Sequence, residues 1–135
     1  MGLILDSDVL IRHERTGRSD FFTPYTARGN AYISAITVSE LLLGVHLADS
    51  RKRRSRRLAF VESLLNLLPV FDFASETARI HAEIHASLRQ RGALIGAHDL
   101  IVAATAVQHG CAVVTSNHRE FSRVPGLEVI PVQDE

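Results

Sequence analysis

The sequence predicts an α/β fold, a three-layer α/β/α sandwich built on a central parallel sheet. Short apolar runs such as residues 3–5 and 111–116 alternate along the chain with longer segments. In the longer segments apolar residues recur every three or four positions, which is the spacing of one helical face. Strands that alternate with helices favour parallel pairing with helices on both faces of the sheet.

The first part of the chain predicts two strands and two helices. Residues 3–5 are expected to form a buried strand, and a short helix is expected from about 7 to 13. The segment 16–30 is rich in turn-forming residues and predicts a loop with a single helical turn. A second strand is expected at 31–34, followed by a helix at 37–49 that begins with Thr37 as its N-cap.

The remainder predicts three helices and three strands. Leu58, Val61 and Leu65 lie on one face of a helix within 51–68, which Pro69 ends. A second helix begins at a Ser75 cap and ends at Gly92. The third is apolar almost all round, so it should be buried. The expected ranges are helices 51–68, 75–92 and 98–110, and strands 70–73, 111–116 and 127–132.

Composition predicts one globular domain that spans residues 1–135. Of the 135 residues, 46% are apolar and 22% are charged, and the formal net charge is zero. Cys111 is the only cysteine, which excludes an intrachain disulfide, fits a cytoplasmic setting, and is most simply a core residue. The apolar N-terminus is too short to cross a membrane and contains two aspartates, so no membrane association is expected.

Four polar residues are placed where functional groups collect in a parallel α/β sheet, outside the carboxyl ends of the strands. Asp6 directly follows the first strand, and Asn117 follows the strand at 111–116. Glu40 and Asp99 lie in the first turns of two predicted helices. All four should therefore face the same edge of the sheet.

A cation would explain why acids gather at that edge. Like charges in water-poor surroundings resist joint ionisation, and a divalent cation removes the penalty. Mg²⁺ and Mn²⁺ prefer oxygen ligands. The alternative for Asp6, Glu40 or Asp99 taken singly is a helix cap, and for Asp8, in a helical first turn, capping is the favoured interpretation.

Four ordered blocks make the chain resemble the PIN-domain nucleases, and within them the VapC-type toxins of bacterial toxin–antitoxin pairs. The blocks cover nearly the whole chain. They are "ILDSDVLI" at the start, "ISAITVSELLLGV" at 33–45, "IGAHDLIVAATAVQHG" at 95–110 and "VVTSNHREFSRVPGLEVI" at 113–130. The resemblance implies a PIN-like α/β/α fold and an endoribonuclease that depends on Mg²⁺ or Mn²⁺.

The resemblance also implies a set of catalytic residues. The family's first three acids correspond to Asp6, Glu40 and Asp99, which are expected to hold the metal, with Glu40 alternatively orienting the attacking water. The fourth position, often Asp, corresponds to Asn117, a neutral oxygen ligand that lowers the charge of the site. Three further residues are assigned auxiliary roles: Glu120 through a water, and Thr115 or Ser116 in orienting a ligand or a phosphate.

The same resemblance implies partners. A cognate VapB-type antitoxin is expected, which in such systems places its C-terminal tail in the active-site groove, together with an RNA substrate. A homodimer, or a hetero-oligomer with the antitoxin, is also expected. The leucine-rich segment 39–49 and the adjoining helix carry apolar surface that a second chain could cover.

Basic residues cluster although the total charge is zero. The densest run is 51–57, and a second set, Arg12, Arg15 and Arg18, lies near the predicted site. Arg89 and Arg91 end a helix. Such side chains contact RNA phosphates, and Arg12 is the substrate-binding candidate, but a basic helix start is also commonly a solvated face or a contact for an acidic partner.

Three histidines also have positions that could serve a metal or the site. His81 and His85 have metal-ligand spacing, but Glu83 is misplaced for the zinc-protease motif, so a structural or exposed role is favoured. His98 either tunes the site beside Asp99 or lies on the surface.

Two rival functions are open to the same sequence. One rival is a HAD-like phosphatase, in which the two acids of "ILDSD" serve as nucleophile and acid. The other is a non-cleaving PIN-type module that binds RNA or protein.

Overall fold

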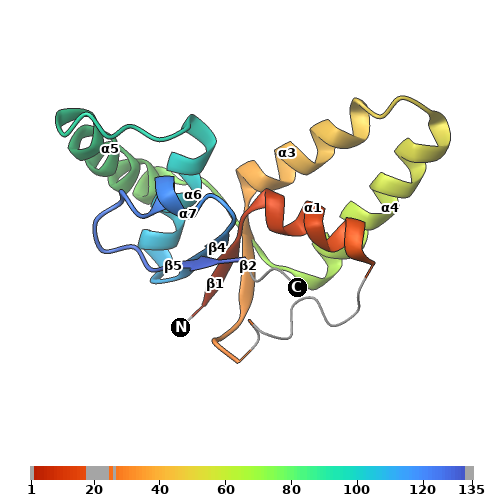
Figure 1. The fold of residues 1–135 in the computed structure, drawn as a ribbon, viewed down its shortest axis with the longest axis horizontal. Helices are drawn as coiled ribbons and strands as arrows, with labels where there is room; N and C mark the ends of the chain where they lie inside the picture. Colours follow the sequence, from red (N-terminus) through yellow and green to blue (C-terminus); the bar gives the residue numbers. More distant parts are fainter. Residues whose placement is uncertain (1, 18–24, 26, 133–135) are drawn as a thin grey trace.

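A five-stranded, all-parallel sheet forms the centre of the described molecule (Figure 1). The computed structural model describes residues 2–17, 25 and 27–132. The strand order is β3-β2-β1-β4-β5, so the first strand lies in the middle. The strands are β1 (Leu3–Leu5), β2 (Ala31–Ser34), β3 (Val70–Phe71), β4 (Ala112–Thr115) and β5 (Val129–Pro131).

Helices connect successive strands on both sides of this sheet. They are α1 (Ser7–Thr16), α3 (Ala35–His46), α4 (Arg51–Leu67), α5 (Ser75–Gln90), α6 (Ala97–His109) and the short α7 (His118–Phe121). In Figure 1 the pair α3 and α4 extends to one side of the sheet region, while α5 lies on the opposite side. None of the helices in the described part of the chain has the length and apolar character needed to cross a bilayer.

The alternating side chains of the central strand separate two hydrophobic clusters. Leu3 and Leu5 pack with residues of α1, α3 and α4, such as Leu10 and Val61. Ile4 packs on the other face with α5, α6 and the segment around Phe121. Because successive strand residues point to opposite faces, β1 is buried on both sides. The predicted three-layer α/β/α architecture is confirmed.

The register of the sheet aligns the strand ends that carry polar residues. Leu3 pairs with Ala31 of β2 and with Ala112 of β4. The ends of β1, β2 and β4 therefore come to one edge, which brings Asp6, Ser34 and Thr115 to comparable heights. Cys111, just before β4, is buried in the second cluster, as expected of a core cysteine.

The starts of two helices differ from the prediction. Helix α3 begins at Ala35, and its N-cap is Ser34, whose hydroxyl accepts a hydrogen bond from the Ile36 amide at 3.3 Å. Thr37 was expected to be the cap but is fully buried inside the helix. Helix α5 is preceded by Ala74, whose amide donates to Thr77 Oγ1 at 3.2 Å, so Ser75 is not its cap. In each case another nearby hydroxyl meets the requirement for a capping group.

Other boundaries moved by a few residues. Helix α1 continues to Thr16, where Gly17 ends it with a φ of 61°, a conformation that glycine adopts without strain. Strand β3 contains only two residues, and β4 and β5 are shorter than expected. The helical turn expected within 16–30 falls largely on 18–24 and 26, outside the described residues.

Candidate active site

Asp6 occupies the position where the central strand meets the first helix. Its side chain is almost completely buried, with 5% of its surface exposed. One carboxylate oxygen, Oδ1, accepts a hydrogen bond from the Ser7 amide at 2.9 Å, so Asp6 is the N-cap of α1. Asp6 is therefore a helix cap, one of the two alternatives predicted for it, and it stands at the edge of the sheet where a cation ligand was expected.

A threonine supports the other oxygen of Asp6 from the neighbouring strand. Thr115, the last residue of β4, is fully buried, and its hydroxyl donates to Asp6 Oδ2 at 2.8 Å. The same hydroxyl oxygen accepts a hydrogen bond from the Asn117 amide at 2.9 Å. A continuous chain of hydrogen bonds therefore runs from the Asn117 amide through the Thr115 hydroxyl to the Asp6 carboxylate. In this chain Thr115 orients the acid.

The surroundings of Asp6 disfavour its charged form. Burial raises the pKa of Asp6 to about 6, and the nearby charges of Asp8 and Asp99 add to this effect. The hydrogen bonds from Thr115 and the Ser7 amide oppose it. Because the carboxylate loses water and has acidic neighbours, a nearby cation would favour its ionised form.

Asp99 lies in the first turn of α6 and is half-buried. Burial raises the pKa of Asp99, a hydrogen bond from Asn117 lowers it, and the charges of Glu120 and Glu40 raise it. The pKa of Asp6 also responds to Asp99. Acids from four separate elements therefore influence one another electrostatically, as expected of a site assembled at one edge of the sheet.

Asn117 joins two of these acids through its side-chain amide. Its Nδ2 donates to Asp99 Oδ2 at 2.9 Å and also to Glu120 Oε2. The sequence predicted Asn117 as a neutral oxygen ligand, whereas here the nitrogen of the amide faces the acids. Glu120, expected to act only through a water, is held directly in the cluster. The signal for this was its position three residues after Asn117, within the short helix α7.

Glu40 projects from α3 at the rim of the site, where its side chain is 31% exposed. Its Oε2 lies 3.6 Å from Nδ1 of His98, the residue that precedes Asp99. His98 is itself 56% exposed, so it lies on the surface, which is one of the two alternatives predicted for it.

Asp8 binds the loop that follows β4. It lies in the first turn of α1, as predicted, but Asp6 is the capping residue. Oδ2 of Asp8 accepts hydrogen bonds from the Ser116 amide, at 3.1 Å, and from the Ser116 hydroxyl. Ser116, predicted to orient a ligand or a phosphate, is therefore engaged with Asp8. This contact fixes the loop that carries Thr115 and Asn117.

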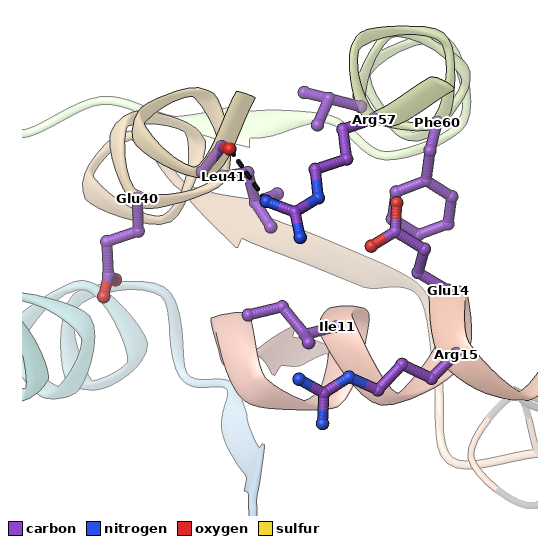
Figure 2. Close-up of a pocket in the computed structure, with 9 residues that line it drawn as sticks. Ile11, Glu14, Arg15, Glu40, Leu41, Arg57 and Phe60 are labelled. Atoms are coloured by element: carbon purple, nitrogen blue, oxygen red, sulfur yellow. Dashed lines mark hydrogen bonds between the residues drawn. The ribbon is translucent and has the colours of Figure 1, made fainter. Parts of the chain in front are cut away.

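The predicted basic residues fall into distinct places. Arg12 lies half-buried on α1, and Arg15 lines a cavity together with Glu40 (Figure 2). Arg18 lies outside the described residues. The run 51–57 forms the exposed start of α4. At the end of α5, Arg91 donates to the carbonyl of Arg123 at 2.7 Å, a structural contact.

Among the described residues, no three acidic, histidine or cysteine side chains already stand in a metal-coordinating arrangement. His81 and His85 contact each other edge to face, with ring centroids 5.9 Å apart, and Phe73 lies against His81. This pair belongs to a small aromatic cluster on α5, in agreement with the structural role favoured from sequence.

The chemistry of the donor set nevertheless fits a hard divalent cation. Asp6 and Asp99 offer carboxylate oxygens, both have raised pKa values because of burial and acidic neighbours, and the charges of Glu40 and Glu120 act on Asp99. Mg²⁺ and Mn²⁺ take such oxygen ligands and retain several waters, so a site of two or three protein carboxylates is sufficient.

Comparison with known proteins places the chain. The sequence pattern of the PIN domain matches residues 3–127. Ribonuclease VapC1 of Rickettsia felis is 38% identical over 132 residues, which cover 98% of this chain and 97% of that protein. The tRNA(fMet)-specific endonuclease VapC of Salmonella typhimurium is 37% identical over 97 residues, or 72% of this chain and 71% of that protein.

Solved structures agree with the sequence relatives. DNA-bound VapBC from Salmonella typhimurium contains a chain that matches with a TM-score of 0.88 and 28% identity, over 98% of this chain and 99% of that chain. VapBC2 from Rickettsia felis, bound to a promoter DNA fragment, matches with a TM-score of 0.85 and 25% identity, over 98% and 100%. This protein therefore belongs to the PIN-domain family and, within it, to the VapC ribonucleases.

Proposed function

We propose that this protein is the toxin of a VapBC-type toxin–antitoxin pair and cleaves RNA as an endoribonuclease dependent on Mg²⁺ or Mn²⁺. Its relatives are named ribonucleases and endonucleases, one of them specific for tRNA(fMet). Structural neighbours are VapBC complexes. The protein would act in the cytoplasm, where such a pair meets RNA.

The observation that carries this proposal is the buried, hydrogen-bonded Asp6 at the end of β1, coupled electrostatically to Asp99 on α6. Asp6 and Asp99 would hold the principal cation, and Glu40 would complete the ligand set. A bound divalent cation lowers the pKa of a coordinated water and withdraws charge from the phosphoryl oxygens, which is the chemistry that phosphodiester hydrolysis needs.

The protein's own side chains arrange and charge this site. Thr115 holds Asp6 in one orientation through its hydroxyl. Asn117 holds Asp99 and Glu120 toward each other and, as an amide, adds no further negative charge. As the alternative to a ligand role, Glu40, which lies more exposed at the rim, would orient the attacking water and accept its proton. We assign Glu120 as the fourth acid and Asn117 as the residue that positions it.

A VapB-type antitoxin is the proposed protein partner, since neighbouring structures are complexes of this kind, some of them on DNA. A homodimer is also proposed. Leu43 of α3 and Leu47, the residue after it ends, are 56% and 72% exposed, and a second chain that covers them would remove this apolar surface from water.

The two rival functions separate clearly. The HAD-like phosphatase is not supported, because the chain belongs to the PIN-domain family and Asp8 is engaged with Ser116. A non-cleaving module remains the second candidate on one observation: the amide Asn117 stands at a position that is often an acid in the family. Cleavage by the purified protein distinguishes the two.

The deciding experiment incubates purified protein with total RNA in Mg²⁺, in Mn²⁺ and in EDTA, and maps the new RNA ends by sequencing. We expect discrete ends that require a divalent ion and vanish in Asp99→Asn. The matched control is Glu83→Gln, an acid-to-amide change at an exposed position on α5, which should cut like the wild type. Cutting by Asp99→Asn at the wild-type rate would contradict the assignment.

A further inference from the structure

Two cavities that share lining residues lie between helices α1, α3 and α4, and the one that includes Glu40 is drawn in Figure 2. The first has a volume of about 260 Å³ and includes Glu40 and Gly44 in its lining. The second has a volume of about 450 Å³ and adds two arginines. Glu14, Arg57 and Phe60 line both cavities, so the two cavities adjoin and extend from the rim of the candidate active site to the start of α4.

One face of α4 supplies most of the charge along this path. Arg53, Arg56, Arg57 and Phe60 occupy positions i, i+3, i+4 and i+7 of the helix, so they lie on the same side of it. All four line the second cavity, where Glu14 is the acidic residue in the lining. We call this set of four residues, together with the two cavities that they line, the arginine groove.

The arginine at the junction of the two cavities is fixed in place. Nη1 of Arg57 donates to the carbonyl oxygen of Gly44 at 3.0 Å, across the contact between α3 and α4 (Figure 2). A carbonyl oxygen is neutral, so this bond orients the guanidinium without cancelling its charge. Arg53, in contrast, pairs at 3.1 Å with Asp49, which lies just before α4, and this ion pair reduces its contribution.

The location of this charge answers an electrostatic difficulty of the active site. The acids Asp6, Asp99, Glu40 and Glu120 repel a polyanion, and a bound cation offsets this only at the scissile phosphate. We propose that the arginine groove binds the RNA strand flanking that phosphate, with arginines on the backbone and Phe60 as a stacking surface for a base. This inference rests on the proposed ribonuclease function and extends it to the path of the substrate.

Two observations favour RNA over an acidic protein segment. The groove opens at Glu40, where the reaction is proposed, so a strand held at the active site enters it without a break. An aromatic ring set among arginines also matches the way proteins hold single-stranded nucleic acids, in which bases stack on rings while cations follow the backbone.

The first test measures binding without cleavage. A fluorescein-labelled single-stranded RNA of about 20 nucleotides is titrated in EDTA, and anisotropy gives the Kd at several salt concentrations. Arg56→Glu and Arg57→Gln should weaken binding about fivefold at low salt and lower the slope of log K against log salt by about 0.7 for each lost contact. The matched control is Arg79→Glu on exposed α5, which should leave binding unchanged.

A second test blocks the groove without changing charge. A Cβ added at Gly44 meets nothing within 4 Å, so Gly44→Ala fits without a clash, and Gly44→Leu extends the side chain further from the same Cβ; both residues suit a helix interior. Their side chains narrow the first cavity in order of size. In Mg²⁺, kcat/KM should fall progressively for a long RNA and stay unchanged for an oligonucleotide too short to leave the active site.

Each test can overturn the proposal separately from the ribonuclease function. Equal RNA binding by Arg56→Glu and Arg79→Glu overturns it, whether or not the wild type cuts RNA. If polyglutamate bound through Arg56 and Arg57 while RNA binding did not depend on them, the groove would be assigned to an acidic protein segment instead. Failure of the wild type to cut any RNA in Mg²⁺, with intact groove binding in EDTA, would contradict only the proposed function.

Discussion

Thr115 donates a hydrogen bond to Asp6 at 2.8 Å, and both side chains are buried in the molecule. We expect Thr115→Val to lower the free energy of unfolding by about 1–3 kcal/mol, because valine keeps the shape but leaves a buried carboxylate oxygen without its donor. RNA cleavage should fall through kcat, since the acid loses its fixed orientation. Chemical denaturation and steady-state cleavage kinetics measure the two effects.

Two variants make this test specific. Thr115→Ser keeps the hydroxyl and should retain most of the activity. Thr105→Val removes another buried hydroxyl, one that donates to the Ile101 carbonyl at 2.8 Å within α6, and should leave kcat unchanged. Equal kcat values for Thr115→Val and Thr105→Val would show that the Thr115–Asp6 bond has no part in catalysis.

The raised pKa of Asp6 predicts how the metal-free protein responds to pH. The folded value is about 6 and the ordinary value is 3.8, so the folded state holds this proton more tightly than the unfolded state. The contribution of this group to the free energy of unfolding therefore falls by about 3 kcal/mol as pH rises from about 4 to about 6. Above that pH it stays level. Asp6→Asn resembles the protonated acid and lacks this loss.

The difference between the two proteins isolates the effect of Asp6. In EDTA, urea denaturation should give similar stabilities for wild type and Asp6→Asn near pH 4, with the variant progressively more stable toward pH 7. Glu83→Gln on exposed α5 controls for a general change of charge. A constant difference between wild type and Asp6→Asn across this range would contradict a raised Asp6 pKa.

Much of this fold was predictable because its elements have strong local signals. The buried strand 3–5 and the nearly apolar helix beginning at Ala97 require no knowledge of their neighbours to be recognised. Helix caps were less predictable, since hydroxyl residues gather around the starts of α3 and α5 and only the folded backbone decides which one meets an amide. Thr37 satisfied the capping preference in sequence but was needed as a buried residue.

In the candidate site, too, the positions of the residues were more predictable than the contacts between their side chains. The edge of the sheet where Asp6 and Asp99 meet follows from strand order alone. The direction of the Asn117 amide does not, because asparagine offers an oxygen and a nitrogen and the choice depends on its neighbours. Asp99 and Glu120 accept hydrogen bonds, so the nitrogen faces them. Asn117 and Asp99 are 18 positions apart in the chain, so local sequence does not reveal this contact.

That arrangement predicts the effect of restoring the more common acid. Asn117→Asp removes the bonds donated to Asp99 and Glu120 and adds a charge between them. The free energy of unfolding in EDTA should fall by about 1–3 kcal/mol. Mg²⁺ should then stabilise Asn117→Asp more than the wild type, which thermal melts with and without the ion would show.

The control for this change is Asn66→Asp, which adds the same charge at an exposed position on α4. It should melt like the wild type in EDTA and gain no extra stability from Mg²⁺. If Asn117→Asp and Asn66→Asp behaved alike in both conditions, Asn117 would have no part in organising the acids.

Divalent ions should stabilise the folded protein by binding to it alone. A ligand at ten times its Kd adds about 1.4 kcal/mol, which for a chain of this size raises Tm by a few degrees. Because the cation competes with the proton that Asp6 holds below about pH 6, this gain should be larger at pH 8 than at pH 5.5. Asp6→Asn and Asp99→Asn should lose the gain, whereas Glu83→Gln should keep it. A Tm that rises equally in all four proteins would place the ion elsewhere on the molecule and remove the basis for assigning Asp6 and Asp99 as its ligands.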